Sequence, residues 1–211
     1  MSKTYEKPPP DVLALLDKVK ADCHPDLMAA GVTFGVLMVH PNLNKEGIAT
    51  APALKVKGQD YPALAEISIN EPKNRLLGMA DVKLLINAPA WDDEEPEGRE
   101  ACLDHELEHI TVVEDEPMEI EEPVEGQPDQ FRKVIRKQYR VDDNGLVVLR
   151  GREHDVYVGG FRSVIHRRGR HAIEARVIGG YAREFRQTLF AWADDMAGVP
   201  EGEVTHGGVG L

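Results

Sequence analysis

Apolar positions early in the chain are spaced as in a helix. Four of them recur at intervals of three and four, at Val12, Leu15, Leu16 and Val19. This spacing predicts an amphipathic helix over residues 11–23, with Asp11 as its N-cap. The preceding residues 1–10 are polar and end in three prolines, so we expect an extended N-terminal arm there.

Three short segments of the first half are predicted to be strands. They are rich in apolar and β-branched residues and lie at 32–39, 65–69 and 81–87. Residues 42–59 are rich in Gly, Pro, Asn and Lys, which favours a loop. A second helix is expected from Arg99 to about Val113, entered through an acidic, turn-like segment at 91–98.

The composition changes abruptly after this helix. Residues 114–130 carry many carboxylates and three prolines, which predicts an exposed, acidic, proline-rich loop. A hairpin is expected next, because Asn144-Gly145 separates the strand-like runs 131–141 and 146–150.

The C-terminal part is predicted to be helical. One helix is expected at about 155–168 and a longer one at 171–197, followed by a Gly-rich, flexible tail at 198–211. An apolar stripe on the longer helix comprises Ala175, Ile178, Ala182, Phe185, Leu189 and Trp192. Such a stripe either covers the core of its own domain, which is the commoner outcome, or binds a protein partner. The whole pattern predicts an α+β fold whose principal domain spans residues 11–170.

Composition and charge narrow the classes of function. The formal net charge is −12, and a negative field repels the phosphate backbone, so nucleic acid is not the expected partner. The start of the chain lacks the apolar core of a secretory signal, and no stretch is long and apolar enough to span a membrane. Two cysteines do not suggest a disulfide framework. We therefore expect a cytoplasmic protein.

The candidate chemistry lies in the second predicted helix, in the sequence His105-Glu106-Leu107-Glu108-His109. Histidines four residues apart project from one helical face, one turn apart, and their imidazoles can share a zinc ion. Glu106, beside the first ligand, is then the candidate general base toward a water molecule at the metal. The alternative is a solvated helix face on which Glu106 and its acidic neighbours Asp104 and Glu108 are exposed.

A catalytic zinc usually has three protein ligands, so one more is needed. His154 is the best candidate, because the predicted hairpin returns the chain toward the second helix there. Asp155 and Glu153 are the alternatives, and Asp155 is also a candidate N-cap or a carboxylate that orients an imidazole. The remaining histidines lack comparable spacing and are expected to be surface or structural residues: His24, His40, His166, His171 and His206.

Several blocks occur in a distinctive order. They are His24-Pro25-Asp26-Leu27, Gly31 to Val36, Tyr61 to Ala65, Arg75 to Asp81 with Trp91 after it, Leu103 to His109, and His154-Asp155 followed by Phe161. With these blocks the chain resembles the phage metallopeptidase family over about residues 11–169. The resemblance implies a zincin-like domain, in which a small mixed or antiparallel sheet packs on the helix with the two histidines. It also implies zinc on His105, His109 and His154, in a host cytoplasm or a virion.

The leading hypothesis is therefore a zinc metallopeptidase that acts on a protein or peptide, with Glu106 as general base. One alternative is a non-catalytic zinc-binding phage protein that binds a host or virion protein. Another is a protease directed at DNA-bound proteins, which the net charge of −12 disfavours.

Overall fold

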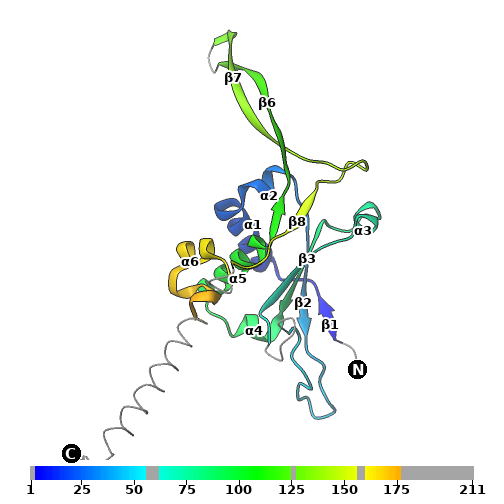
Figure 1. The fold of residues 1–211 in the computed structure, drawn as a ribbon. Coiled ribbons are helices and arrows are strands. Elements are labelled where there is room, and N and C mark those ends of the chain that lie inside the picture. Colours follow the sequence, from blue (N-terminus) through cyan, green and yellow to red (C-terminus); the bar gives the residue numbers. More distant parts are fainter. Residues whose placement is uncertain (1–2, 56–61, 125–126, 156–159, 177–211) are drawn as a thin grey trace, which may run out of the picture.

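A four-stranded mixed sheet organises the protein (Figure 1). The computed structural model describes residues 3–55, 62–124, 127–155 and 160–176. The strands are β1 (Thr4–Glu6), β2 (Phe34–His40), β3 (Ala65–Ile69) and β4 (Val82–Asn87), in the order β1-β2-β4-β3. Strands β2 and β4 are parallel, and the two edge strands are antiparallel to their neighbours. The three predicted strands are confirmed, and the predicted N-terminal arm contains β1.

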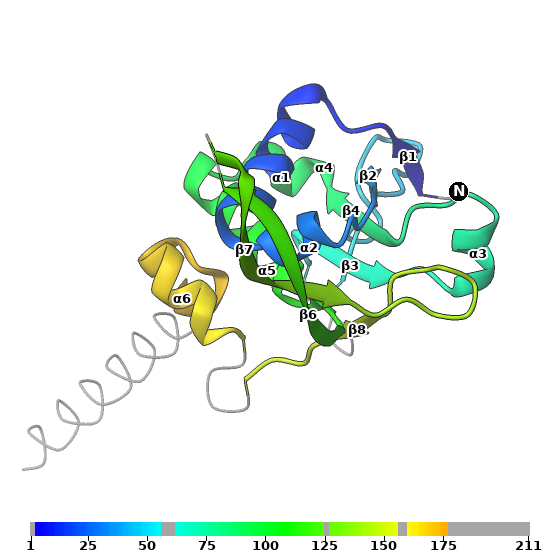
Figure 2. The ribbon, with the colours of Figure 1, turned by 90° about the horizontal axis from the view of Figure 1, so that it is seen from above.

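Two long helices cover the sheet and enclose the main core. Helix α1 (Pro10–Cys23) and helix α5 (Pro96–Glu108) pack on each other, as Figures 1 and 2 show. Core side chains come from both helices and from the sheet, among them Val12, Leu16, Val19, Leu84, Ile86, Leu103 and Leu107. The predicted first helix is confirmed, but its N-cap is Pro9 and not Asp11. Pro10 begins the helix, at a position where a missing N–H costs no hydrogen bond.

The shorter helices correct several predicted boundaries. They are α2 (Pro25–Ala29), α3 (Pro72–Leu76), α4 (Ala88–Asp92), α6 (Arg162–Arg168) and the 3₁₀ turn η1 (Gly169–His171). The segment 91–98 is not simply turn-like, because α4 contains Trp91 and α5 already begins at Pro96. The helix predicted at 155–168 begins only at Arg162. Upstream of it, Asp155 forms a β-bridge with Gly160.

Helix α5 ends earlier than predicted. It stops at Glu108, and β5 (Ile110–Val112) follows where the sequence predicted helix to Val113. The β-branched run pairs antiparallel with β8 (Leu149–Gly151), far along the chain. Tertiary pairing has therefore overridden the continuation of the helix.

Among the described residues of the acidic segment 114–130, residues 114–124 and 127–130 lie in two strands and not in a loop, so this prediction is wrong. β6 (Glu114–Val124) pairs antiparallel with β7 (Gln127–Tyr139), and Figure 1 shows the ribbon extending away from the sheet. Basic side chains of β7 face the carboxylates across the ribbon, as in the Lys133–Glu119 and Lys137–Glu114 ion pairs. Opposite charges on facing strands stabilise such pairing, so the high charge of β6 does not prevent a strand.

The predicted Asn-Gly turn is confirmed, but its strands have other partners. Gly145 has φ of 79°, and the Asp142 N–H donates to the Leu146 carbonyl across the turn. Only a short bridge between Val141 and Val147 extends it, because β7 pairs with β6 and β8 pairs with β5.

The C-terminal predictions lie mostly outside the described residues. Residues 173–176 are helical, and the remainder of the helix predicted at 171–197, with the tail at 198–211, is not described. Of the predicted apolar stripe, Ala175 packs against a small cluster of Phe161, Val164 and Ala172. No described helix is long and apolar enough to cross a membrane. The α+β class is confirmed.

Candidate metal centre

The three predicted ligands meet in space. His105 lies on α5, His109 directly follows its last residue, and His154 lies beyond β8. The Nε2 atom of His154 lies 3.3 Å from that of His105 and 3.2 Å from that of His109. His154, which lies more than 40 positions along the chain from the other two histidines, thus directs its Nε2 atom to the same point as theirs.

This spacing fits a small four-coordinate cation. Zinc takes histidine nitrogen at about 2.0–2.1 Å in a tetrahedral arrangement, which separates ligand nitrogens by roughly 3.3–3.4 Å. The two measured separations, 3.3 and 3.2 Å, are close to this value. The donor set and these two separations are therefore compatible with zinc, as with other small cations that bind imidazole.

Hydrogen bonds to the opposite ring nitrogens fix which atoms face the cluster. Nδ1 of His109 lies 2.9 Å from the Arg152 carbonyl, which can only accept, so this nitrogen carries the proton. Nδ1 of His105 lies 2.7 Å from Oε1 of Glu174 and donates to it. The Nε2 atoms of both rings therefore present lone pairs, and such an arrangement favours a bound cation.

Strand pairing explains how His154 reaches α5. Ile110 of β5 pairs with Gly151 of β8, so the residues beyond this pair are also brought together. His109 and Arg152 are the next two, and their main chains are joined because the Arg152 N–H donates to the His109 carbonyl at 2.7 Å. His154 follows two residues after Arg152 and therefore lies close to the end of α5.

Two contacts of the cluster were not predicted from the sequence. Phe161 is fully buried, and its ring centroid lies 5.3, 4.7 and 5.1 Å from those of His105, His109 and His154. Glu174 is 3% exposed and bonds both His105 and the Phe161 N–H. Phe161 belongs to the last of the ordered sequence blocks, but its contact with the imidazoles was not predicted, and Glu174 has no sequence spacing that relates it to the two-histidine motif.

The alternative third ligands do not join the cluster. Asp155 instead accepts a hydrogen bond from the Arg162 N–H at the start of α6 and pairs with the Arg152 guanidinium. It is not the N-cap, a position that Phe161 occupies. Glu153 is exposed. Among the described residues, no fourth His, Cys, Asp or Glu completes the group of three.

Electrostatics differ among the three imidazoles. Burial alone would lower the pKa of His105, but the Glu174 hydrogen bond and nearby carboxylates raise that pKa above its ordinary value. Burial lowers the pKa of His109 and His154, and the adjacent His105 contributes in the same direction. Two of the three rings therefore favour the neutral form that binds a metal.

Glu106 is held at the edge strand β3. Its carboxylate is 8% exposed and accepts a hydrogen bond from the Ile67 N–H. Burial raises the pKa of Glu106 to about 7. The charge of His105 and the Ile67 hydrogen bond lower this pKa, and the charge of Glu66 raises it. A carboxylate with a pKa near neutrality is suited to exchanging protons at physiological pH.

The neighbouring face of α5, about 100° around the helix, is not solvated either. Asp104 is fully buried, and its two oxygens accept hydrogen bonds from His24, Arg167 and Arg168 at 2.7–3.0 Å. Glu108 pairs with Arg152 and Arg167. The exposed helix face considered from the sequence is thus wrong for Asp104 and Glu106, and His24 is a buried structural residue.

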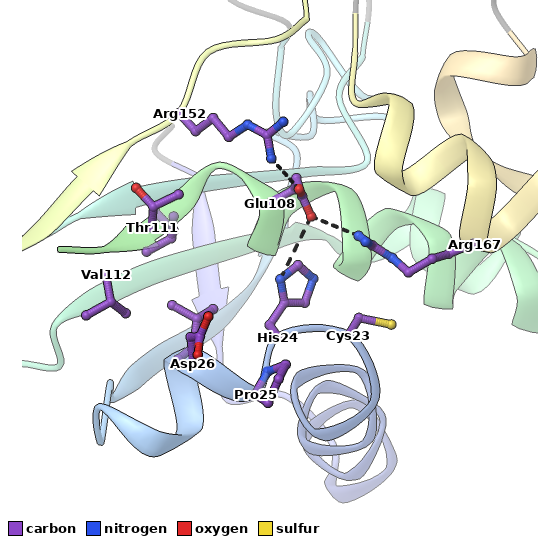
Figure 3. A pocket seen from close by; sticks show the side chains of 11 residues that line it. Cys23, His24, Pro25, Asp26, Glu108, Thr111, Val112, Arg152 and Arg167 are labelled. Carbon is purple, nitrogen blue, oxygen red and sulfur yellow. Dashed lines mark hydrogen bonds and ion pairs between the residues drawn. The ribbon is translucent and has the colours of Figure 1, made fainter. Parts of the chain in front are cut away.

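Figure 3 shows the pocket of about 280 Å³ beside this second cluster. Arg152 and Arg167 approach Glu108 from two sides, with His24 below. His24, Asp104 and Glu108 also have metal-ligand spacing, but Nη2 of Arg167 lies 2.7 Å from Asp104 Oδ1 and 2.8 Å from Glu108 Oε2. A guanidinium thus already occupies the cation position.

No protein-family model, no curated protein and no solved structure matches this chain. The resemblance to the phage metallopeptidase family therefore stays a prediction from the sequence.

Proposed function

We propose that the protein is a zinc-dependent hydrolase, and specifically a metallopeptidase with a zincin-like arrangement. The observation that carries this proposal is the convergence of the Nε2 atoms of His105, His109 and His154, with the first two held as lone-pair donors by hydrogen bonds at Nδ1. The buried carboxylate of Glu106, on the same helix, supports a hydrolytic rather than a purely structural centre.

The accessibility of the three imidazoles also supports catalysis. His105 is buried, His109 is half-buried and His154 is exposed. A structural zinc is normally enclosed by four protein ligands, whereas a catalytic zinc keeps one position for water or substrate. Three donors that open toward solvent on the His154 side fit the second case.

The roles of the residues follow from their positions. Zinc held by the three imidazoles would supply Lewis acidity toward a water molecule and a substrate carbonyl. The Glu106 carboxylate accepts the proton of the attacking water and then donates it to the leaving nitrogen. The Ile67 N–H keeps that carboxylate at the edge of β3. Glu174 and the Arg152 carbonyl hold two of the imidazoles in the tautomer that binds a metal.

The test separates the proton-transfer role from metal binding. In Glu106→Gln, zinc content measured by elemental analysis should equal that of the wild type. Cleavage of fluorescently labelled casein should fall by at least about 10²–10⁴-fold, the usual contribution of a general base. Glu97→Gln is the matched control, because this exposed carboxylate lies on the same helix, α5, in its first turn.

Each outcome bears on a different part of the proposal. Cleavage by Glu106→Gln at the wild-type rate would remove Glu106 from the mechanism. A zinc-loaded wild type that cleaves neither casein nor a peptide library would instead favour a non-catalytic zinc protein. A wild type that takes up no zinc would refute the metal centre itself.

A further inference from the structure

The segment from Ala172 to Arg176 docks on the body of the protein at two separate points. At one, Oε1 of Glu174 accepts hydrogen bonds from Nδ1 of His105 at 2.7 Å and from the Phe161 N–H at 3.0 Å. At the other, both guanidinium NH₂ groups of Arg176 pair with the Glu94 carboxylate at 2.9 Å. Only the first point includes a candidate metal ligand.

Two glycines provide the space for this docking. A Cβ atom at Gly160 would overlap Cγ of Glu174, and one at Gly98 would overlap the Glu94–Arg176 ion pair. Gly98 lies in the first turn of α5, although glycine is a poor helix former. A residue that weakens the helix at this position is consistent with close approach of the C-terminal segment.

The burial of Glu174 is costly, which points to a role beyond packing. Its side chain is 1% exposed, and Oε2 has no hydrogen-bond partner among the described residues. An unpaired buried carboxylate oxygen is unfavourable, and such groups in folded proteins are rare. Oε1, in contrast, joins the first metal-ligand candidate to the aromatic ring that packs on all three imidazoles.

We propose that Glu174 is a positioning residue that links metal occupancy to docking of residues 172–176. This inference rests on the proposed metal centre. With the segment docked, Glu174 holds His105 so that Nε2 faces the other two imidazoles. Linkage is reciprocal: if docking raises zinc affinity by some factor, zinc must favour docking by the same factor.

Hydrogen exchange on the full chain tests the linkage, with zinc-loaded and metal-free protein compared. A carboxylate that orients a ligand histidine usually contributes about 10–100-fold to metal affinity. Because linkage is reciprocal, zinc should slow exchange of the amides of 172–176 and of Phe161 by about the same factor. In Glu174→Ala, zinc affinity should fall by the same factor, and exchange in the segment should no longer depend on zinc. Glu174→Gln, which keeps an oxygen acceptor, should recover part of both effects.

Glu94→Gln is the matched control, because it weakens the other docking point without touching a ligand. Exchange of the segment should rise both with and without zinc, while the slowing by zinc stays as in the wild type. If Glu94→Gln loses the dependence on zinc as Glu174→Ala does, Glu174 has no special role.

Failure of the linkage is distinguishable from failure of the metal centre. Wild type that binds zinc through the three imidazoles, yet exchanges equally fast with and without it, overturns the linkage alone. Wild type that takes up no zinc overturns both proposals.

Discussion

Two faces of helix α5 each carry ionisable side chains, but these side chains have different partners on the two faces. On one face His105 and His109 meet His154, and on the other Asp104 and Glu108 meet His24. Both groups have the spacing of metal ligands. Arginine side chains neutralise the second group, whereas the first directs three Nε2 atoms at one point.

The difference shows that ligand spacing alone does not identify a metal site. Arg167 bridges the same two oxygen atoms that a cation would need on the Asp104 face. Buried carboxylates are stable only when paired, and here the fixed positive charges pair them permanently. On the histidine face Nδ1 of His105 and Nδ1 of His109 are each paired with an acceptor, so the Nε2 lone pairs of these two rings are available to an external cation.

The largest expected effect is a loss of zinc affinity when a histidine of the three-imidazole face is removed. His154→Ala should weaken zinc binding roughly a thousandfold, one ligand's share of the ~10–16 kcal/mol typical of zinc sites. Competition with a chromophoric chelator measures this affinity. His166→Ala, which changes an exposed histidine of α6 outside both clusters, should bind zinc as the wild type does. Equal affinities in the two variants would remove His154 from the site.

The next effect concerns stability. Asp104→Ala should lower the free energy of unfolding by about 3–5 kcal/mol in urea, because it removes the buried carboxylate that His24, Arg167 and Arg168 share. The loss should be the same with and without zinc. Glu100→Gln, which changes a partly exposed partner of Arg168, should cost less than about 1 kcal/mol. A zinc-dependent loss in Asp104→Ala would show that the two faces are not independent.

The smallest effect is a difference in acid sensitivity. Hydrogen bonds from His24, Arg167 and Arg168 outweigh burial and hold the pKa of Asp104 below its usual range. Its contribution to stability is complete above the unfolded value of about 3.9 and is lost as the pH falls toward the lower folded pKa. Zinc affinity should instead fall once the pH drops below the raised pKa of His105, because protons compete with the metal.

At about pH 4.5, between these two windows, the protein should be folded but largely free of zinc. Circular dichroism and zinc content, measured along one pH series, check this order. Unfolding that coincides with zinc release would contradict it.

The sequence by itself determined the local parts of this protein. The helical spacing of α1, the apolar runs of β2 and β4, and the Asn-Gly turn were all predicted, because each depends on neighbours within a few residues. The relation of His105 to His109 is of the same kind, since four residues along a helix place two side chains on one face. His154 was selected only as the best of three candidates.

Only the tertiary structure decided what surrounds these parts. Pairing of β5 with β8 brings His154 to the helix, and docking of the C-terminal segment brings Glu174 to His105. The strand β6 was missed because its carboxylates look unfavourable until the basic β7 lies opposite. In each case the stabilising partner is distant in sequence, and no local pattern encodes the energy of a long-range contact.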